Sequence, residues 1–127
     1  MQQRWPNRLW IVRHGESAGN VAAEAAHGAS LARIDIAERD VDVPLSALGV
    51  RQADAVGRWF ADLAARDRPE IVLTSPYLRA RQTSEHIRAA GGLAQGAPEH
   101  LVDERLREKE LGLLDRLTRT GVEQLHP

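Results

Sequence analysis

The sequence predicts a single α/β domain with a mostly parallel sheet flanked by helices. Two short apolar runs, residues 9–12 and 70–74, are each followed by a polar loop and then by a stretch of helical periodicity. Strands that alternate with helices favour a parallel sheet, because parallel neighbours need a crossover connection between them. A length of 127 residues suits one domain, which we expect to span residues 1–127.

The first part of the chain is expected to contain one strand, one helix and a long irregular connection. Residues 9–12 read Leu-Trp-Ile-Val between Arg8 and the polar residues 13–20, which is typical of a buried central strand that ends in a loop. A helix is expected over residues 19–26. Periodicity is poor over residues 27–44, which predicts an irregular segment.

The middle of the chain carries the clearest helical pattern. This pattern begins at Ser46, a suitable N-cap, and we expect the helix to reach Arg66. The apolar run 70–74 is expected to pair beside the first strand. A second helix is expected over residues 77–90, where the glycine pair beginning at Gly91 stops it.

The last third of the chain carries weaker patterns. A short strand is expected at residues 99–102, ahead of a charged stretch at 103–110. We assign no further helix or strand to the polar end of the sequence.

Composition excludes several classes of protein. There are no cysteines, so disulfides, thiolate nucleophiles and zinc–cysteine sites are excluded. The longest apolar run, 9–12, is far shorter than the ~20 residues of a membrane helix, so we expect a cytoplasmic protein without a membrane partner. A net charge of −1 gives no global attraction to nucleic acid, and no spaced set of histidines and acidic residues indicates a metal or cofactor.

The residues that follow the first strand suit phosphate chemistry. Arg13 can grip an oxyanion with its guanidinium group, and Gly15 lets backbone N–H groups approach that anion closely. Between them, His14 is a competent nucleophile near neutral pH and can accept a phosphoryl group. Taken alone, this motif is more typical of a solvated surface turn.

A second polar loop follows the second strand. It places Arg79 in the first turn of a helix, where it could meet the same anion from the opposite side. Alone, this stretch is more typical of a helix start with solvated arginines. Together, the two loops indicate two arginines that converge on one phosphate.

Four motifs in this order resemble the histidine phosphatase superfamily, also called phosphoglycerate mutase-like. They extend over almost the whole chain, which makes the resemblance specific. They are Arg13–Ser17 with Asn20, Leu45–Gly49 followed by Gln52-Ala53, Ser75–Thr83, and Arg105–Gly112.

The resemblance implies roles for individual residues. His14 corresponds to the phosphate-accepting nucleophile, and Arg13 and Arg79 correspond to the phosphate clamp. Ser17 and Asn20 correspond to residues of the phosphate pocket. The expected ligand is a small phosphorylated metabolite.

The resemblance also implies a general acid. Glu108 matches the family's acid, which protonates the leaving alcohol and then helps to activate water. Glu104 and Glu110 compete for this role by position, and we expect Glu110 to be solvated.

Two departures from the family pattern qualify these expectations. The phosphoglycerate mutases usually have an aromatic residue after the first motif and a Gly-Trp pair further on, where this chain has Ala18-Gly19 and residues 39–42. Family members also continue to a second His-Gly motif, which none of the downstream histidines fits: His86, His100 and His126. We therefore expect a domain that lacks its C-terminal part.

The preferred function is that of a metal-independent phosphatase, which hydrolyses a small phosphate monoester through a phosphohistidine. One alternative is a catalytically impaired fragment that binds a phospholigand and lacks the second catalytic histidine. A phosphoglycerate mutase-type phosphotransferase is the other. An incomplete sheet would expose an apolar edge, which favours a homodimer.

Overall fold

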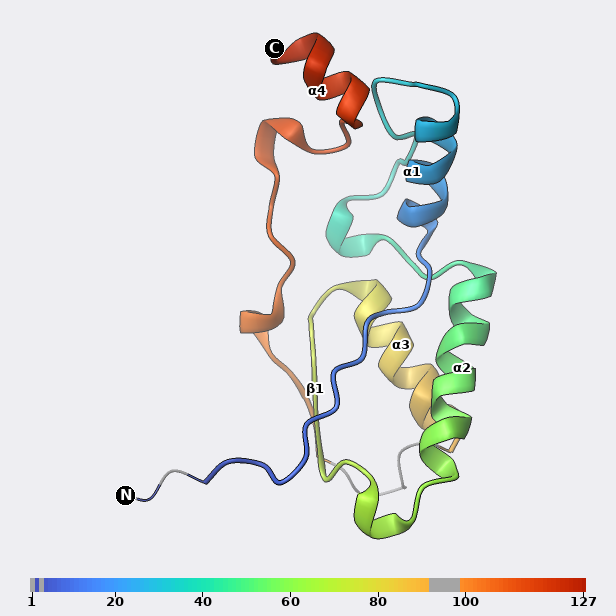
Figure 1. Ribbon diagram of the computed structural model, residues 1–127, viewed down its shortest axis with the longest axis vertical. Coiled ribbons are helices and arrows are strands. Elements are labelled where there is room, and N and C mark those ends of the chain that lie inside the picture. Colours follow the sequence, from blue (N-terminus) through green and yellow to red (C-terminus); the bar gives the residue numbers. More distant parts are fainter. Residues whose placement is uncertain (1, 3, 92–98) are drawn as a thin grey trace.

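The computed structural model describes residue 2, residues 4–91 and residues 99–127. Short 3₁₀ turns and extended segments connect the helices and strands (Figure 1). In this part of the chain the helices and strands are α1 (Ala18–Gly28), α2 (Ala47–Ala61), β1 (Ile71–Thr74), α3 (Leu78–Ala89), β2 (Glu99–Val102) and α4 (Arg119–Leu125).

The described sheet is small and parallel. β1 and β2 pair in register from Ile71 opposite Glu99 to Thr74 opposite Val102, and α3 lies between them in the sequence. This arrangement confirms the predicted α/β class and the weak strand pattern at residues 99–102.

Residues 9–12 are not a strand in the described structure, so the expected central strand is wrong. A strand needs a ladder of backbone hydrogen bonds, and the described structure contains none made by the backbone of this segment. Its side chains are also open, with Leu9 and Ile11 72% and 88% exposed. Only Trp10 turns inward, and its ring meets Trp59 and Phe60 edge-on at 5.3 and 5.6 Å.

The predicted helices are confirmed, with different ends. Ser46 caps α2 by accepting a hydrogen bond from the Gly49 amide. α2 ends at Ala61 rather than at Arg66, where the Arg68 side chain donates to the Ala61 carbonyl oxygen and so satisfies a group of the last turn. Arg68 also donates to the Leu63 carbonyl oxygen just beyond the helix. Helix α4 lies in the polar end, where no helix is expected.

The core of the described structure lies between α2 and α3. Phe60 and Ile87 are 3% and 6% exposed, and Trp10, Val56, Leu63 and Val72 pack around them. The helices approach closely at Gly57, where an added Cβ would lie 2.6 Å from the Ile87 carbonyl oxygen. The N-terminal ends of both helices consequently reach the same loop, which carries the first motif.

Candidate active site

The loop with the first motif is joined to α1 by a reciprocal cap. The Ser17 side chain accepts from the Asn20 amide at 3.1 Å, and the Ser17 amide donates to the Asn20 side chain at 3.0 Å. This capping box satisfies two amides at the start of the helix. Ser17 is 3% exposed, so its hydroxyl serves the fold of the loop, while Asn20 remains exposed.

Helix α2 fixes the other side of this loop. The Glu16 amide donates to Gln52 Oε1 at 2.8 Å, and the Glu16 carbonyl accepts from the Ser46 amide at 2.9 Å. A Cβ at Gly49 would lie 2.0 Å from the Glu16 carbonyl oxygen, and one at Gly15 would lie 2.4 Å from the Gly49 oxygen. Two glycines are therefore required where the loop crosses the start of α2.

Helix α3 anchors the same loop through Thr83. The Gly15 amide donates to Thr83 Oγ1 at 3.1 Å, and this hydroxyl donates to the Arg79 carbonyl at 2.7 Å. In the same helix, Gln82 Oε1 accepts from the Leu45 amide at 2.8 Å. The loop, the start of α2 and the first turn of α3 are thus joined by direct hydrogen bonds.

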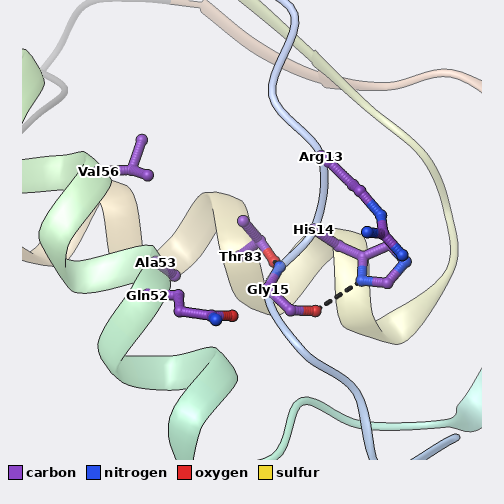
Figure 2. Close-up of a pocket in the computed structure, with 7 residues that line it drawn as sticks. All are labelled: Arg13, His14, Gly15, Gln52, Ala53, Val56 and Thr83. Carbon is purple, nitrogen blue, oxygen red and sulfur yellow. Dashed lines mark hydrogen bonds between the residues drawn. The ribbon is translucent and has the colours of Figure 1, made fainter. Parts of the chain in front are cut away.

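Two hollows are both lined by Arg13, His14 and Gln52. One hollow is completed by Glu16 and Asn20, and the other by Gly15, Ala53, Val56 and Thr83. Figure 2 shows the Arg13 and His14 side chains projecting on the same side of the loop. The structure therefore brings three predicted residues together in one hollow: Arg13, His14 and Asn20.

The ring of His14 is oriented by its own loop. Nδ1 lies 2.6 Å from the Gly15 carbonyl oxygen (Figure 2). A carbonyl only accepts hydrogen bonds, so Nδ1 must carry the proton. In the neutral ring the lone pair is then on Nε2, which is the atom available for nucleophilic attack.

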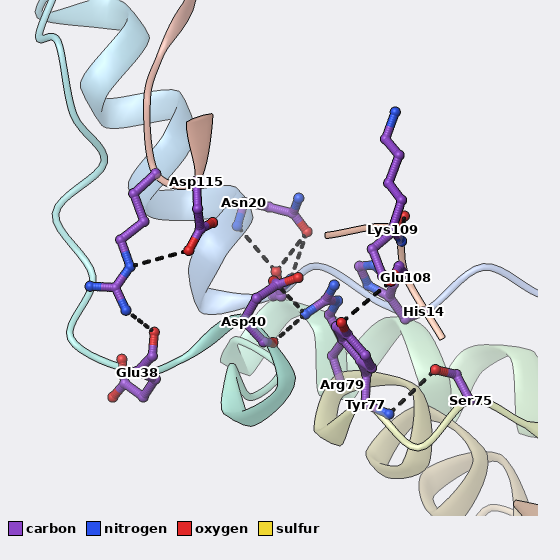
Figure 3. A network of polar contacts seen from close by, with 12 residues as sticks. His14, Asn20, Glu38, Asp40, Ser75, Tyr77, Arg79, Glu108, Lys109 and Asp115 are labelled. Carbon is purple, nitrogen blue, oxygen red and sulfur yellow. Dashed lines mark hydrogen bonds and ion pairs between the residues drawn. The ribbon is translucent and has the colours of Figure 1, made fainter. Parts of the chain in front are cut away.

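Arg79 is held by the connection between α1 and α2. Its Nη1 donates to the Asp40 carbonyl at 2.7 Å and to Asp40 Oδ1 at 3.0 Å (Figure 3). The guanidinium carbon lies 4.9 Å from the Tyr77 ring centroid. Arg79 is 7% exposed and lines neither of the two hollows around His14.

Glu108 is exposed on the segment that follows β2. Its Oε1 accepts from the Lys109 amide at 3.0 Å, and its backbone carbonyl accepts from the Tyr77 hydroxyl at 3.4 Å. Its two competitors are both ion-paired with Arg107, Glu104 at 3.2 Å and Glu110 at 3.7 Å. Among these three acids, Glu108 is the one whose backbone contacts the residue that stacks on Arg79.

The model of the histidine phosphatase superfamily (branch 1) matches residues 9–127 of the chain. The chain belongs to this superfamily. Among curated proteins, fructose-2,6-bisphosphatase TIGAR from Xenopus tropicalis is 34% identical over 104 residues, which cover 82% of this chain and 32% of that protein. The uncharacterized phosphatase PhoE from Bacillus subtilis is 32% identical over 77 residues, which cover 61% of this chain and 32% of that protein.

Solved structures of similar fold support the phosphoglycerate mutase-like architecture. Mycobacterial hydrolase 1 has a TM-score of 0.62 at 26% identity, covering 90% of this chain and 45% of that one. SixA from Agrobacterium tumefaciens has a TM-score of 0.55 at 23% identity, covering 78% of this chain and 51% of that one. The chain therefore spans about half the length of these structures and about a third of the length of the curated relatives.

Several residues of this member of the superfamily have a structural role that the sequence did not reveal. Gln52 and Thr83 fall inside recognised motifs, so the motifs marked them without indicating what they do. Tyr77 likewise lies inside the third motif, which did not indicate its contact with Arg79. Asp40 carried no signal, because it lies in the irregular segment where periodicity fails.

No metal centre is formed by the residues that the structure describes, since none of their His, Asp and Glu side chains gather in groups of three suited to an ion. None of the helices in the same residues combines the length and the apolar character needed to cross a bilayer.

Proposed function

We propose that this protein is a metal-independent phosphatase that hydrolyses a small phosphate monoester through a phosphohistidine on His14. The observation that carries the proposal is the orientation of His14, whose Nδ1 is committed to the Gly15 carbonyl and whose ring lines a hollow with Arg13. Membership of the superfamily and the phosphatase names of the relatives support the same reaction. We also propose a cytoplasmic location, as expected from the sequence.

In the first step, His14 Nε2 attacks phosphorus in line with the leaving oxygen. The N–P bond forms as the P–O bond to the alcohol breaks, and the Glu108 carboxylic acid donates a proton to that oxygen. Arg13 and Arg79 balance the charge on the phosphoryl oxygens.

In the second step, water attacks the phosphohistidine. The Glu108 carboxylate takes a proton from this water, the N–P bond breaks, and its electron pair returns to Nε2. Phosphate leaves and both residues regain their starting protonation states.

A second candidate is phospholigand binding without turnover. In the described part of the chain, His14 is the only histidine that lines either hollow. A site with one donor fewer can still bind an anion, but it stabilises the transition state less, and loss of one oxyanion donor typically slows catalysis by about 10²- to 10³-fold.

One preparation can distinguish the two candidates. Phosphate release from a small monoester is measured with a metal chelator present, and phosphate binding is measured by calorimetry in low salt. Turnover that is lost in His14→Ala supports the phosphatase, whereas binding without turnover supports the second candidate. If the protein shows neither, or if turnover needs an added divalent metal, the phosphohistidine proposal is wrong.

A further inference from the structure

Asp40 is the main hydrogen-bonding partner of Arg79, the second arginine of the proposed phosphate clamp. Its carbonyl and carboxylate oxygens both accept from Arg79 Nη1, at 2.7 and 3.0 Å. The other two guanidinium nitrogens, Nε and Nη2, make no hydrogen bond to the described residues. These two nitrogens form the side-on edge of the guanidinium group, whose geometry matches two oxygens of a phosphate.

The position of Asp40 is itself fixed relative to the nucleophile loop. The segment that follows it is tied to the start of α1, because the Ala18 amide donates to the Pro44 carbonyl at 2.9 Å. The backbone of Arg79 is tied to the same loop through Thr83 and Gly15. Arg79 is thereby held near its Cα by one set of bonds and near its guanidinium by another.

Tyr77 restricts the guanidinium group further. The Arg79 guanidinium carbon lies 4.9 Å from the centroid of its ring. Tyr77 is 3% exposed, so the arginine stacks on a buried ring. Together with Asp40, this leaves the long Arg79 side chain 9% exposed.

We propose that Asp40 is the positioning residue of Arg79: it holds Nη1 and so presents the Nε–Nη2 edge to the phosphate of the substrate. This proposal rests on the proposed function, since it assigns a phosphate to that edge. The benefit is that an arginine already ordered does not lose its rotamer freedom when phosphate binds.

The carboxylate also has an opposing effect, because its negative charge reduces the attraction of Arg79 for an anion. Asparagine and alanine at position 40 separate the two effects. Asp40→Asn removes the charge but keeps a side-chain oxygen that can accept from Nη1. Asp40→Ala removes both the charge and the side-chain acceptor and leaves only the backbone carbonyl.

The test is calorimetric titration of inorganic phosphate into the full chain in low salt. We expect Asp40→Ala to bind phosphate about three- to tenfold more weakly than Asp40→Asn, which corresponds to the ordering of one long side chain. Asp42→Asn is the matched control, because Asp42 lies in the same short turn but pairs with the exposed Arg39 at 2.9 Å. Its phosphate affinity should equal that of the wild type.

A structural defect alone would not reproduce the expected pattern. In an Arg79→Ala background the difference between the two Asp40 variants should disappear, because the pair then has no guanidinium to position. Thermal unfolding checks that each variant is folded, and Asp40→Ser, whose shorter side chain cannot reach Nη1, replaces alanine if that variant does not fold.

Equal phosphate affinities of the alanine and asparagine variants would overturn the proposal. If both bind more tightly than the wild type, Asp40 is a competitor of phosphate rather than a positioning residue. If the wild type binds no phosphate, or binds it equally well with Arg79→Ala, the proposed clamp is wrong and the proposal on Asp40 is wrong with it.

Discussion

Gly15 and Gly49 cross at a distance that excludes any side chain. The Cβ distances of 2.4 and 2.0 Å to backbone oxygens are far below van der Waals contact, and backbone cannot turn aside as a flexible side chain can. At this crossing the Leu45–Gly49 motif packs directly against the first motif. The glycines fix the path of the loop, and the loop fixes the ring of His14.

Gly49→Ala is expected to lower the free energy of unfolding by about 1–3 kcal/mol, because the new methyl group forces the loop and α2 apart. Chemical denaturation measures this change. Gly28→Ala is the matched control: Gly28 is the last residue of α1, and an added Cβ there meets nothing within 4 Å. A Gly49→Ala protein as stable as the wild type would show that the crossing is not tight.

Glu108→Gln should separate substrates by their leaving groups. The variant cannot donate a proton, so hydrolysis of alkyl phosphates is expected to slow by about 10²-fold or more, whereas activated aryl phosphates should change little. Steady-state rates on the two ester classes test this. Glu110→Gln, which removes an acid paired with Arg107, provides the control. An equal loss on both ester classes would remove Glu108 from the role of acid.

The motifs predicted that several candidate site residues lie together, but they did not indicate what holds those residues in place. Arg13, His14 and Asn20 lie together as the motifs predict, and their roles remain predictions. The supporting contacts could not be predicted, because Glu16 meets a side chain 36 residues away and Arg79 meets one 39 residues away. Such pairs depend on how the helices pack and produce no periodic pattern in the sequence.

The helices and strands were predictable where a local signal exists. Caps and apolar spacing located α1, α2, α3 and β1 within a few residues. Residues 9–12 show the limit of this reasoning, since an apolar run does not reveal a hydrogen-bonding partner. Helix α4 shows the converse: it is short and polar, Thr118 caps it, and it packs against Ala32 at Gly121, where an added Cβ would lie 2.0 Å from the Ala32 carbonyl oxygen.

The contact between β2 and α3 should make stability depend on pH. His100 on β2 is hydrogen-bonded to the Ser84 hydroxyl on α3, and burial, followed by the nearby Arg88, lowers the pKa of His100 below its usual 6.5. Between these two pKa values the unfolded chain binds more protons than the folded chain. The free energy of unfolding therefore falls as the pH drops below 6.5, and this loss is absent above it.

Urea denaturation between about pH 5 and pH 8 measures this dependence. We expect His100→Gln to have a shallower pH dependence than the wild type over the same range. His126→Gln, at the exposed end of the chain, should leave the slope unchanged. The same slope in the wild type and in His100→Gln would contradict this explanation.

Within the described part of the molecule, one face of the sheet is left open. Ile71, Leu73 and Leu101 alternate onto the face away from α3 and are 59%, 53% and 43% exposed. Apolar side chains that gather on one face usually mark an interaction surface. The structure thus provides a physical basis for the expected homodimer, which remains a prediction.

We predict that the 127-residue chain self-associates as its concentration rises. Sedimentation velocity should show a mass that grows with concentration, and Leu73→Lys should shift the population toward monomer. Leu113→Lys is the control, because Leu113 is 88% exposed in a turn outside the sheet. A wild-type chain that stays monomeric at high concentration would contradict the prediction.

The most direct test of the central claim is the covalent intermediate itself. The protein is mixed with a labelled phosphate monoester in the presence of a chelator, quenched, and examined for phosphoprotein. We predict a label that is acid-labile and base-stable, that is lost in His14→Ala, and that persists in His27→Ala, since His27 is an exposed histidine with a similar ring contact to a backbone carbonyl at 2.7 Å. Label that survives in His14→Ala, or hydrolysis at the full rate in that variant, would contradict the phosphohistidine mechanism.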